Sequence, residues 1–128
     1  MTDGVLNIVL FVFHTSWIAF NCLGWMRRRT RPWQLATVLL TALSWFGLGA
    51  WYGWGYCPFT DWHWAVRARL GHHDPPSYVQ LLIRELTGID IGPVWADTLA
   101  VTTLAAAALL SVVLNARDRR AMSTSRSA

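Results

Sequence analysis

Side chains that could ligate a metal ion or act in acid–base catalysis gather in one stretch of the chain: Cys57, Asp61, His63, His72, His73 and Asp74. Thiolate, imidazole and carboxylate groups are common zinc ligands and common general acids and bases. Cys57, Asp61 and His63 are therefore candidate catalytic residues, and His63, His72, His73 and Asp74 are candidate metal ligands. The spacing contains no C-x-x-C or H-x-x-x-H pattern. The alternative is an interfacial loop in which the Asp residues cap helices and the His residues are solvated.

His14 is a separate candidate, because it lies in the middle of a long apolar run. Asn7, His14 and Asn21 repeat at intervals of seven residues, so they form one stripe that should face a partner helix rather than lipid. The simpler hypothesis is hydrogen bonding between helices, worth about 0.6 kcal/mol per bond. The alternative makes His14 a haem or chlorophyll ligand or a member of a proton relay. No cofactor is predicted, and haem or a metal ion stays as the alternative.

Three long apolar segments must position these residues, at about residues 5–25, 33–54 and 94–114. Each has about the 20 residues that a helix needs to cross a hydrocarbon core of roughly 30 Å. They contain no basic residue, and Asp97 is their one acidic residue. We therefore predict an all-α fold, an integral membrane three-helix bundle that forms a single membrane domain over residues 1–128.

The first apolar segment is predicted to be retained rather than cleaved as a signal peptide. The chain starts MTDG, which places an acid where a signal peptide carries positive charge, and no A-x-A-like site follows the segment. Phe20 and Asn21 precede Cys22, where a lipoprotein signal would have a small residue, so lipidation of Cys22 is not expected.

The distribution of arginine predicts the orientation. All eleven basic residues are Arg, and the net charge is +4. Eight of them lie beside the ends of the apolar segments: Arg27, Arg28, Arg29, Arg31, Arg117, Arg119, Arg120 and Arg126. The other three lie in the loop at residues 57–92. The positive-inside rule then places the N-terminus outside and the tail, residues 115–128, in the cytoplasm of a bacterial inner membrane. Arginines in this position are typical of juxtamembrane anchors, so we do not expect nucleic acid binding.

The outer loop, residues 57–92, shows two short helix patterns. Thr60 or Asp61 can cap the first, which runs through Leu70, and Ser77 can cap the second, which Gly88 ends. Each has one apolar face. We therefore expect two interfacial helices that lie on the outer membrane surface or cap the bundle.

Antiparallel packing of the first two spans predicts which polar residues meet. His14 would lie level with Ser44, and Asn21 would lie level with Thr37. Cys22 would lie near the inner border of the membrane and Cys57 near the outer border. The two thiols would be too far apart for a disulfide, which needs Cα atoms within about 7 Å.

The run WYGWGYCPFTDWHW follows a span and precedes the apolar helix pattern YVQLLIREL. These features resemble the small bacterial membrane proteins grouped as domain of unknown function 2784. The resemblance covers most of the chain and includes a His in the first span, here His14. It also includes a G-W-x-C-P-x-T pattern, which here has one additional residue before Cys57. It implies a helical membrane fold in bacteria, supplies no activity, and indicates that His14, Cys57, Pro58 and Thr60 should be tested first.

Two classes of function stay open. The first is a small polytopic inner-membrane protein of unknown activity that serves as an accessory or structural subunit. Its partners would be the lipid bilayer and other membrane protein subunits, or further copies of itself, and residues 105–108, all Ala, would suit close helix contact.

The second is an outer-facing enzyme or a ligand- or metal-binding protein that uses Cys57, Asp61, His63, His72 and His73, which should then converge around a cavity. Enzymatic activity is the less supported of the two. Transport is weaker still, because three unbroken spans cannot form a pore without oligomerisation.

Overall fold

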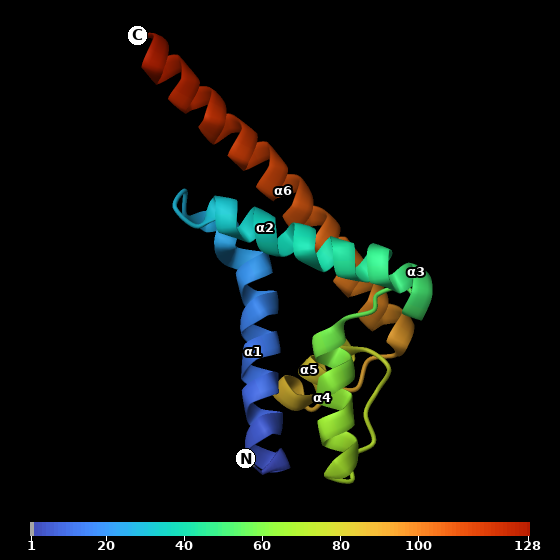
Figure 1. Ribbon diagram of the computed structural model, residues 1–128. Coiled ribbons are helices and arrows are strands. Elements are labelled where there is room, and N and C mark those ends of the chain that lie inside the picture. The colour runs from blue at the N-terminus through green and yellow to red at the C-terminus, as the bar shows by residue number, and fades with distance from the viewer. Residues whose placement is uncertain (1) are drawn as a thin grey trace.

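The computed structural model describes residues 2–128 as a set of helices, with no strand in that range (Figure 1). This confirms the predicted all-α class. The long helices and the short turns that join them are α1 Asp3–Leu23, η1 Gly24–Met26, α2 Arg31–Ala42, η2 Leu43–Leu48, α3 Gly49–Tyr52 and α6 Pro93–Ser127. Two short helices fill the loop before α6, namely α4 Pro58–Arg69 and α5 Tyr78–Thr87.

Three helical stretches are long and apolar enough to cross a membrane, as the three apolar segments of the sequence predict. They are Asp3–Met26, Arg31–Tyr52 and Pro93–Ser127. The second stretch contains a π-helical turn, η2, between α2 and α3. The last stretch continues as one helix through the predicted tail, because no Gly or Pro interrupts the chain after Pro93.

The long helices diverge rather than forming a compact parallel bundle (Figure 1). α2 leaves the C-terminal end of α1 and runs across it, and α6 packs along α2 and then extends past it, so the two termini lie at opposite ends. The corner between α1 and α2 depends on Gly24, because a Cβ there would lie only 2.8 Å from the Cβ of Gln34. Gln34 is buried, and its Nε2 donates a hydrogen bond to the carbonyl of Asn21 at 2.8 Å.

A tight turn after α3 sends the chain back toward α1. Gly53 and Gly55 adopt positive φ angles of 110° and 83°, which favour glycine. The turn is fastened to the π-helical segment, because the Ser44 hydroxyl donates a hydrogen bond to the carbonyl of Tyr56 at 2.7 Å. α4 can therefore start directly at Pro58, in the first turn of the helix, earlier than the predicted cap at Thr60 or Asp61.

The α4–α5 lobe, residues 58–87, lies beside the N-terminal half of α1 (Figure 1). α4 runs along α1, and α5 crosses behind α4. The second helix begins after Ser77 and ends at Gly88, whose φ is 74°, as the sequence predicts. The expected pair of loop helices is therefore present, and it covers the part of α1 that carries Asn7 and His14.

Candidate functional site

His63 is completely buried where α4 meets α1, at 0% exposure. Its Nε2–H donates a hydrogen bond to the side-chain oxygen of Asn7 at 2.8 Å. Its other ring nitrogen, Nδ1, is buried and has no hydrogen-bond partner within residues 2–128. A side chain that the sequence places in an outer loop is thus part of the packing around the first span.

His14 is buried against α5, at 8% exposure. Its ring stacks on the ring of Tyr78 with centroids 3.8 Å apart and planes 16° apart. The Tyr78 hydroxyl donates a hydrogen bond to the carbonyl of Phe11 at 3.1 Å and lies 3.0 Å from the hydroxyl of Thr15. Tyr78 therefore attaches the start of α5 to α1. The Nδ1 of His14, like that of His63, has no partner among the described residues.

A buried ion pair lies one turn after His63 on α4. Arg67 donates from Nε to a carboxylate oxygen of Asp74 at 2.7 Å, and the two side chains are 8% and 6% exposed. The pair ties the C-terminal half of α4 to the connection that leads into α5. His14, His63, Arg67, Asp74 and Tyr78, with Asn7, form what we call the histidine cluster.

The electrostatics of the histidine cluster favour a neutral His63. Burial lowers the pKa of His63, and the neighbouring positive charge of Arg67 lowers it further, while Asp74 and Asn7 act in the opposite direction. Burial also raises the pKa of the Tyr78 hydroxyl, which therefore stays protonated. A neutral imidazole with a free lone pair can accept a proton or a hydrogen bond.

We predict that the protein loses stability on acidification. Because the pKa of His63 is lower in the folded protein than its ordinary value of 6.5, the unfolded chain binds more protons below about pH 6.5. The free energy of unfolding should be level above that pH and should fall below it. Chemical unfolding in detergent between pH 7.5 and 5 measures this.

His63→Gln is the matched variant, because the Gln amide can still donate to Asn7 but does not titrate. It should show a smaller loss of stability between pH 7.5 and 5 than the original chain. An identical acid response in both proteins would contradict this explanation.

Asn21 organises a second polar contact, between α1 and α2. Its side-chain oxygen accepts a hydrogen bond from the Thr37 hydroxyl at 2.9 Å, so the predicted pairing of Asn21 with Thr37 is confirmed. The predicted layer of His14 with Ser44 is wrong. Ser44 bonds to the carbonyl of Tyr56 instead, and the α4–α5 lobe rather than α2 covers His14.

The other candidates from the outer loop do not join His63. Asp61 is exposed and lies 3.4 Å from the Tyr56 hydroxyl, and His72 and His73 are exposed in the connection after α4. Cys57 is half-buried at the start of α4, and both it and Cys22 are free thiols. In the part of the chain that the structure describes, no three His, Cys, Asp or Glu residues are close enough to hold a metal ion. The convergence expected of a catalytic or metal site built from these residues is absent there.

Two members of the histidine cluster, Tyr78 and Arg67, are not indicated as site residues by the sequence. Its patterns mark Tyr78 only as part of a helix, and Arg67 only as one of the charges that set the orientation. One signal could have indicated Arg67: an Arg surrounded by aromatic and apolar residues, followed seven positions later by Asp74. Such an Arg needs an acidic partner if it is buried.

The fold and the site together define a helical membrane protein whose first span is joined to a loop lobe by a buried histidine cluster. A family model described as Protein of Unknown function (DUF2784) matches residues 4–116, so the chain belongs to this family. The predicted resemblance is thereby confirmed, and the match includes every residue of the histidine cluster. No curated protein and no solved structure is similar to the chain.

Proposed function

We propose that this chain is an accessory subunit of a larger assembly in the bacterial inner membrane. The observation that supports this is a groove of about 290 Å³ between the end of α1 and the middle of α6. Its walls are Cys22, Trp25, Thr102, Thr103, Ala106, Ala107 and Leu110. The groove lies within the apolar stretches, where either lipid chains or another helix must fill it.

The residues of the groove favour a helix over lipid. Helices pack closely in membranes where small side chains such as Ala and Thr let the backbones approach, and hydroxyl groups can bond across the contact. Thr102, Thr103, Ala106 and Ala107 give α6 such a surface, whereas the opposite face of α6 presents Val101 and Val112, which are 52% and 54% exposed. The small-residue side suits a protein partner, and the large-residue side suits lipid.

Photo-crosslinking in native membranes tests the subunit role. A photoreactive amino acid at Thr103 or Ala106 should give one discrete adduct with the same partner polypeptide, which can be a second copy of this chain. The same probe at Val112, on the opposite face of α6, is the control and should give no such adduct. Migration as an unlinked monomer with probes at all three positions would contradict the proposal.

We infer further that the N-terminus and the α4–α5 lobe face the outside and that the C-terminus is cytoplasmic. The charges divide sharply between the two ends of the molecule. The end formed by residues 26–32 and 115–128 carries eight Arg and a single acid, Asp118. The remaining three Arg share the other parts of the chain with six acids: Asp3, Asp61, Asp74, Glu85, Asp90 and Asp97. Basic residues accumulate on the cytoplasmic side of bacterial membrane proteins, which supports this orientation.

A second candidate function is ligand or proton binding by the histidine cluster on the outer side. The observation that favours it is the pair of buried Nδ1 atoms, on His14 and His63, that lack hydrogen-bond partners within residues 2–128. Buried polar atoms of this kind are uncommon in folded proteins and often mark a functional group. Proton uptake by the purified, folded protein below about pH 6.5 should be smaller in His63→Gln, which keeps a donor to Asn7 and does not titrate. Equal uptake in both proteins would remove this candidate.

A further inference from the structure

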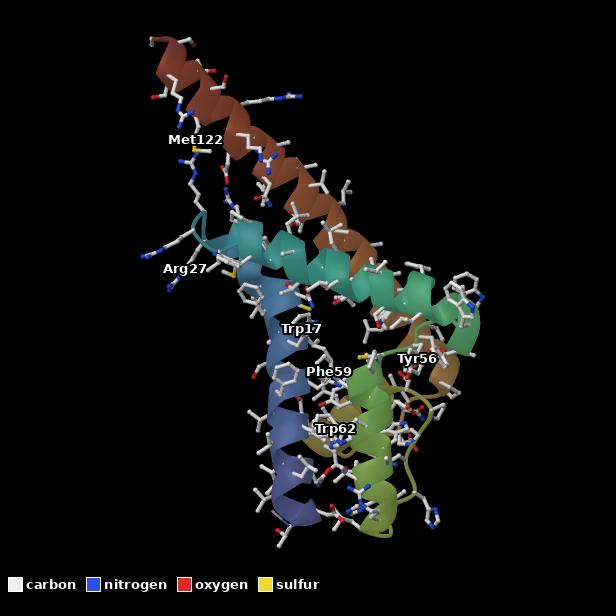
Figure 2. The ribbon with its side chains drawn as sticks, in the orientation of Figure 1. Trp17, Arg27, Tyr56, Phe59, Trp62 and Met122 are labelled. Atoms are coloured by element: carbon white, nitrogen blue, oxygen red, sulfur yellow. The ribbon has the colours of Figure 1, made fainter. Side chains whose placement is uncertain are left out.

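One end of the molecule brings two arginine groups together that are far apart in the sequence. We call this surface the arginine end, and it consists of Arg27, Arg28, Arg29, Arg31, Arg117, Arg119 and Arg120. Asp118 of α6 joins the two groups, because it accepts from Arg28 at 3.1 Å and from Arg31 at 2.9 Å. Figure 2 shows Arg27 and Met122 at this end, away from Trp62 in the α4–α5 lobe.

Most of the arginine end has no ion-pair partner in the described chain. Asp118 forms ion pairs with Arg28 and Arg31, whereas Arg27, Arg29, Arg117, Arg119 and Arg120 form none within residues 2–128. These five side chains belong to exposed residues. By contrast, the three Arg of the other parts of the chain all lie in ion pairs: Arg67, Arg69 and Arg84. The uncompensated positive charge is therefore concentrated at one end.

The spacing of the arginine end from the apolar run matches the depth of lipid headgroups. Arg117, Arg119 and Arg120 follow Leu114, the last residue of the apolar run, by three to six positions, which is roughly 4 to 9 Å along a helix. The headgroup layer of one leaflet is about 5 to 8 Å thick. Trp33 borders the same end and is 72% exposed, as expected of an indole at the interface.

We propose that the arginine end binds the phosphate groups of anionic phospholipids. A guanidinium group presents paired N–H donors that match phosphate oxygens, and a cluster of several gains affinity from each added charge. An acidic protein or a nucleic acid would match the charge as well. The position directly beside the apolar run favours lipid. Lipid phosphates lie at that depth in both leaflets, whichever side of the membrane the arginine end faces. This inference rests on the proposed membrane location but not on the accessory role or on any partner.

Native mass spectrometry of the full-length protein in mild detergent tests the proposal. Phosphatidylglycerol is the anionic probe, phosphatidylcholine is the zwitterionic control, and inorganic phosphate tests whether a free anion suffices. The original chain should retain phosphatidylglycerol in preference to the other two. The variant Arg27→Gln/Arg29→Gln should bind phosphatidylglycerol roughly 25-fold more weakly, at about fivefold for each arginine.

Arg69→Gln/Arg84→Gln is the matched control, because it removes the same charge from the opposite end. Its affinity for phosphatidylglycerol should stay within about twofold of the original. Circular dichroism and gel filtration check that both variants keep the fold. Equal binding of phosphatidylglycerol by the two double variants would overturn the proposal, as would equal retention of phosphatidylcholine. Preferential binding of a polyglutamate peptide would also overturn it and assign the surface to an acidic protein.

Discussion

Replacing Arg67 with Ala should destabilise the folded protein by about 3–5 kcal/mol, because it leaves the carboxylate of Asp74 buried without its partner. The ion pair is 2.7 Å long and both side chains are almost fully covered, so water cannot replace the lost guanidinium. Asp74→Asn should cost less, because Arg67 keeps its ion pair with Glu85 at 3.9 Å and the Asn oxygen can still accept a hydrogen bond from it. Chemical unfolding in detergent, followed by circular dichroism, gives the difference in the free energy of unfolding.

Arg69→Ala provides the matched control for this prediction. Arg69 lies two positions further along α4 and pairs with Asp3, but that pair is solvent-exposed, and exposed pairs contribute little to stability. Its unfolding curve should nearly overlay that of the original chain. If Arg67→Ala and Arg69→Ala unfold alike, the buried pair does not hold the α4–α5 lobe in place.

Replacing Tyr78 with Ala should also cost about 3–5 kcal/mol, as is usual for truncating a buried aromatic side chain. Tyr78 is the residue on which α1, α4 and α5 converge, because its ring contacts His14 and lies 6.0 Å from the rings of His63 and Trp64. Tyr78→Phe keeps the ring and removes only the hydroxyl that bonds to α1, so it should cost about 1 kcal/mol. The same unfolding experiment measures both variants.

Hydrogen exchange shows which helices lose stability when Tyr78 is replaced by Ala. In Tyr78→Ala, the amides of α4 and α5 should exchange faster while those of α2 and α6 keep their protection, because the hydrogen bonds and ring contacts of Tyr78 join the lobe to α1. Uniform loss of protection in all helices would mean that the lobe is not a separate unit of stability. Similar costs for the Ala and Phe variants would mean that the hydroxyl, not the ring, carries the attachment.

The three spans and both loop helices could be predicted from the sequence because their signals are local. Each span is an apolar run of sufficient length, and α5 is bounded by Ser77 and Gly88, whose residue types suit helix ends. The π-helical turn at residues 43–48 could not be predicted in this way. It depends on the turn after α3, where Ser44 bonds to Tyr56 and the backbone of Trp54 approaches Gly49 so closely that a Cβ on Gly49 would lie 3.3 Å from it.

The histidine cluster could be predicted only in part. The spacing of Asn7, His14 and Asn21 correctly indicated that this face of α1 meets protein, and the buried positions of His14 and Asn21 agree. Antiparallel packing of the first two spans over their full length predicts that His14 meets the second span. In the structure the two helices meet at a corner, and the α4–α5 lobe fills the space beside the N-terminal half of α1 (Figure 1).

The three histidines of the outer loop differ in burial, because the packing of α4 rather than their proximity in the sequence decides which of them is covered. Proximity in the sequence places His63 with His72 and His73, but a helix turns its residues to different sides. His63 points from the covered side of α4 toward Asn7, whereas His72 and His73 follow the helix in an exposed connection. Burial, which depends on how α4 packs against α1, separates a structural or functional histidine from a solvated one.

We propose that lipid surrounds three crossing helices, with the α4–α5 lobe on the outside and the end of α6 in the cytoplasm. Labelling of single cysteines in intact cells by a membrane-impermeant maleimide tests it most directly, using His72→Cys and Ser125→Cys in a chain whose Cys22 and Cys57 are replaced by Ser. We predict labelling at position 72 in intact cells and at position 125 only after the cells are permeabilised. Labelling of both positions in intact cells, or of neither, would contradict the account.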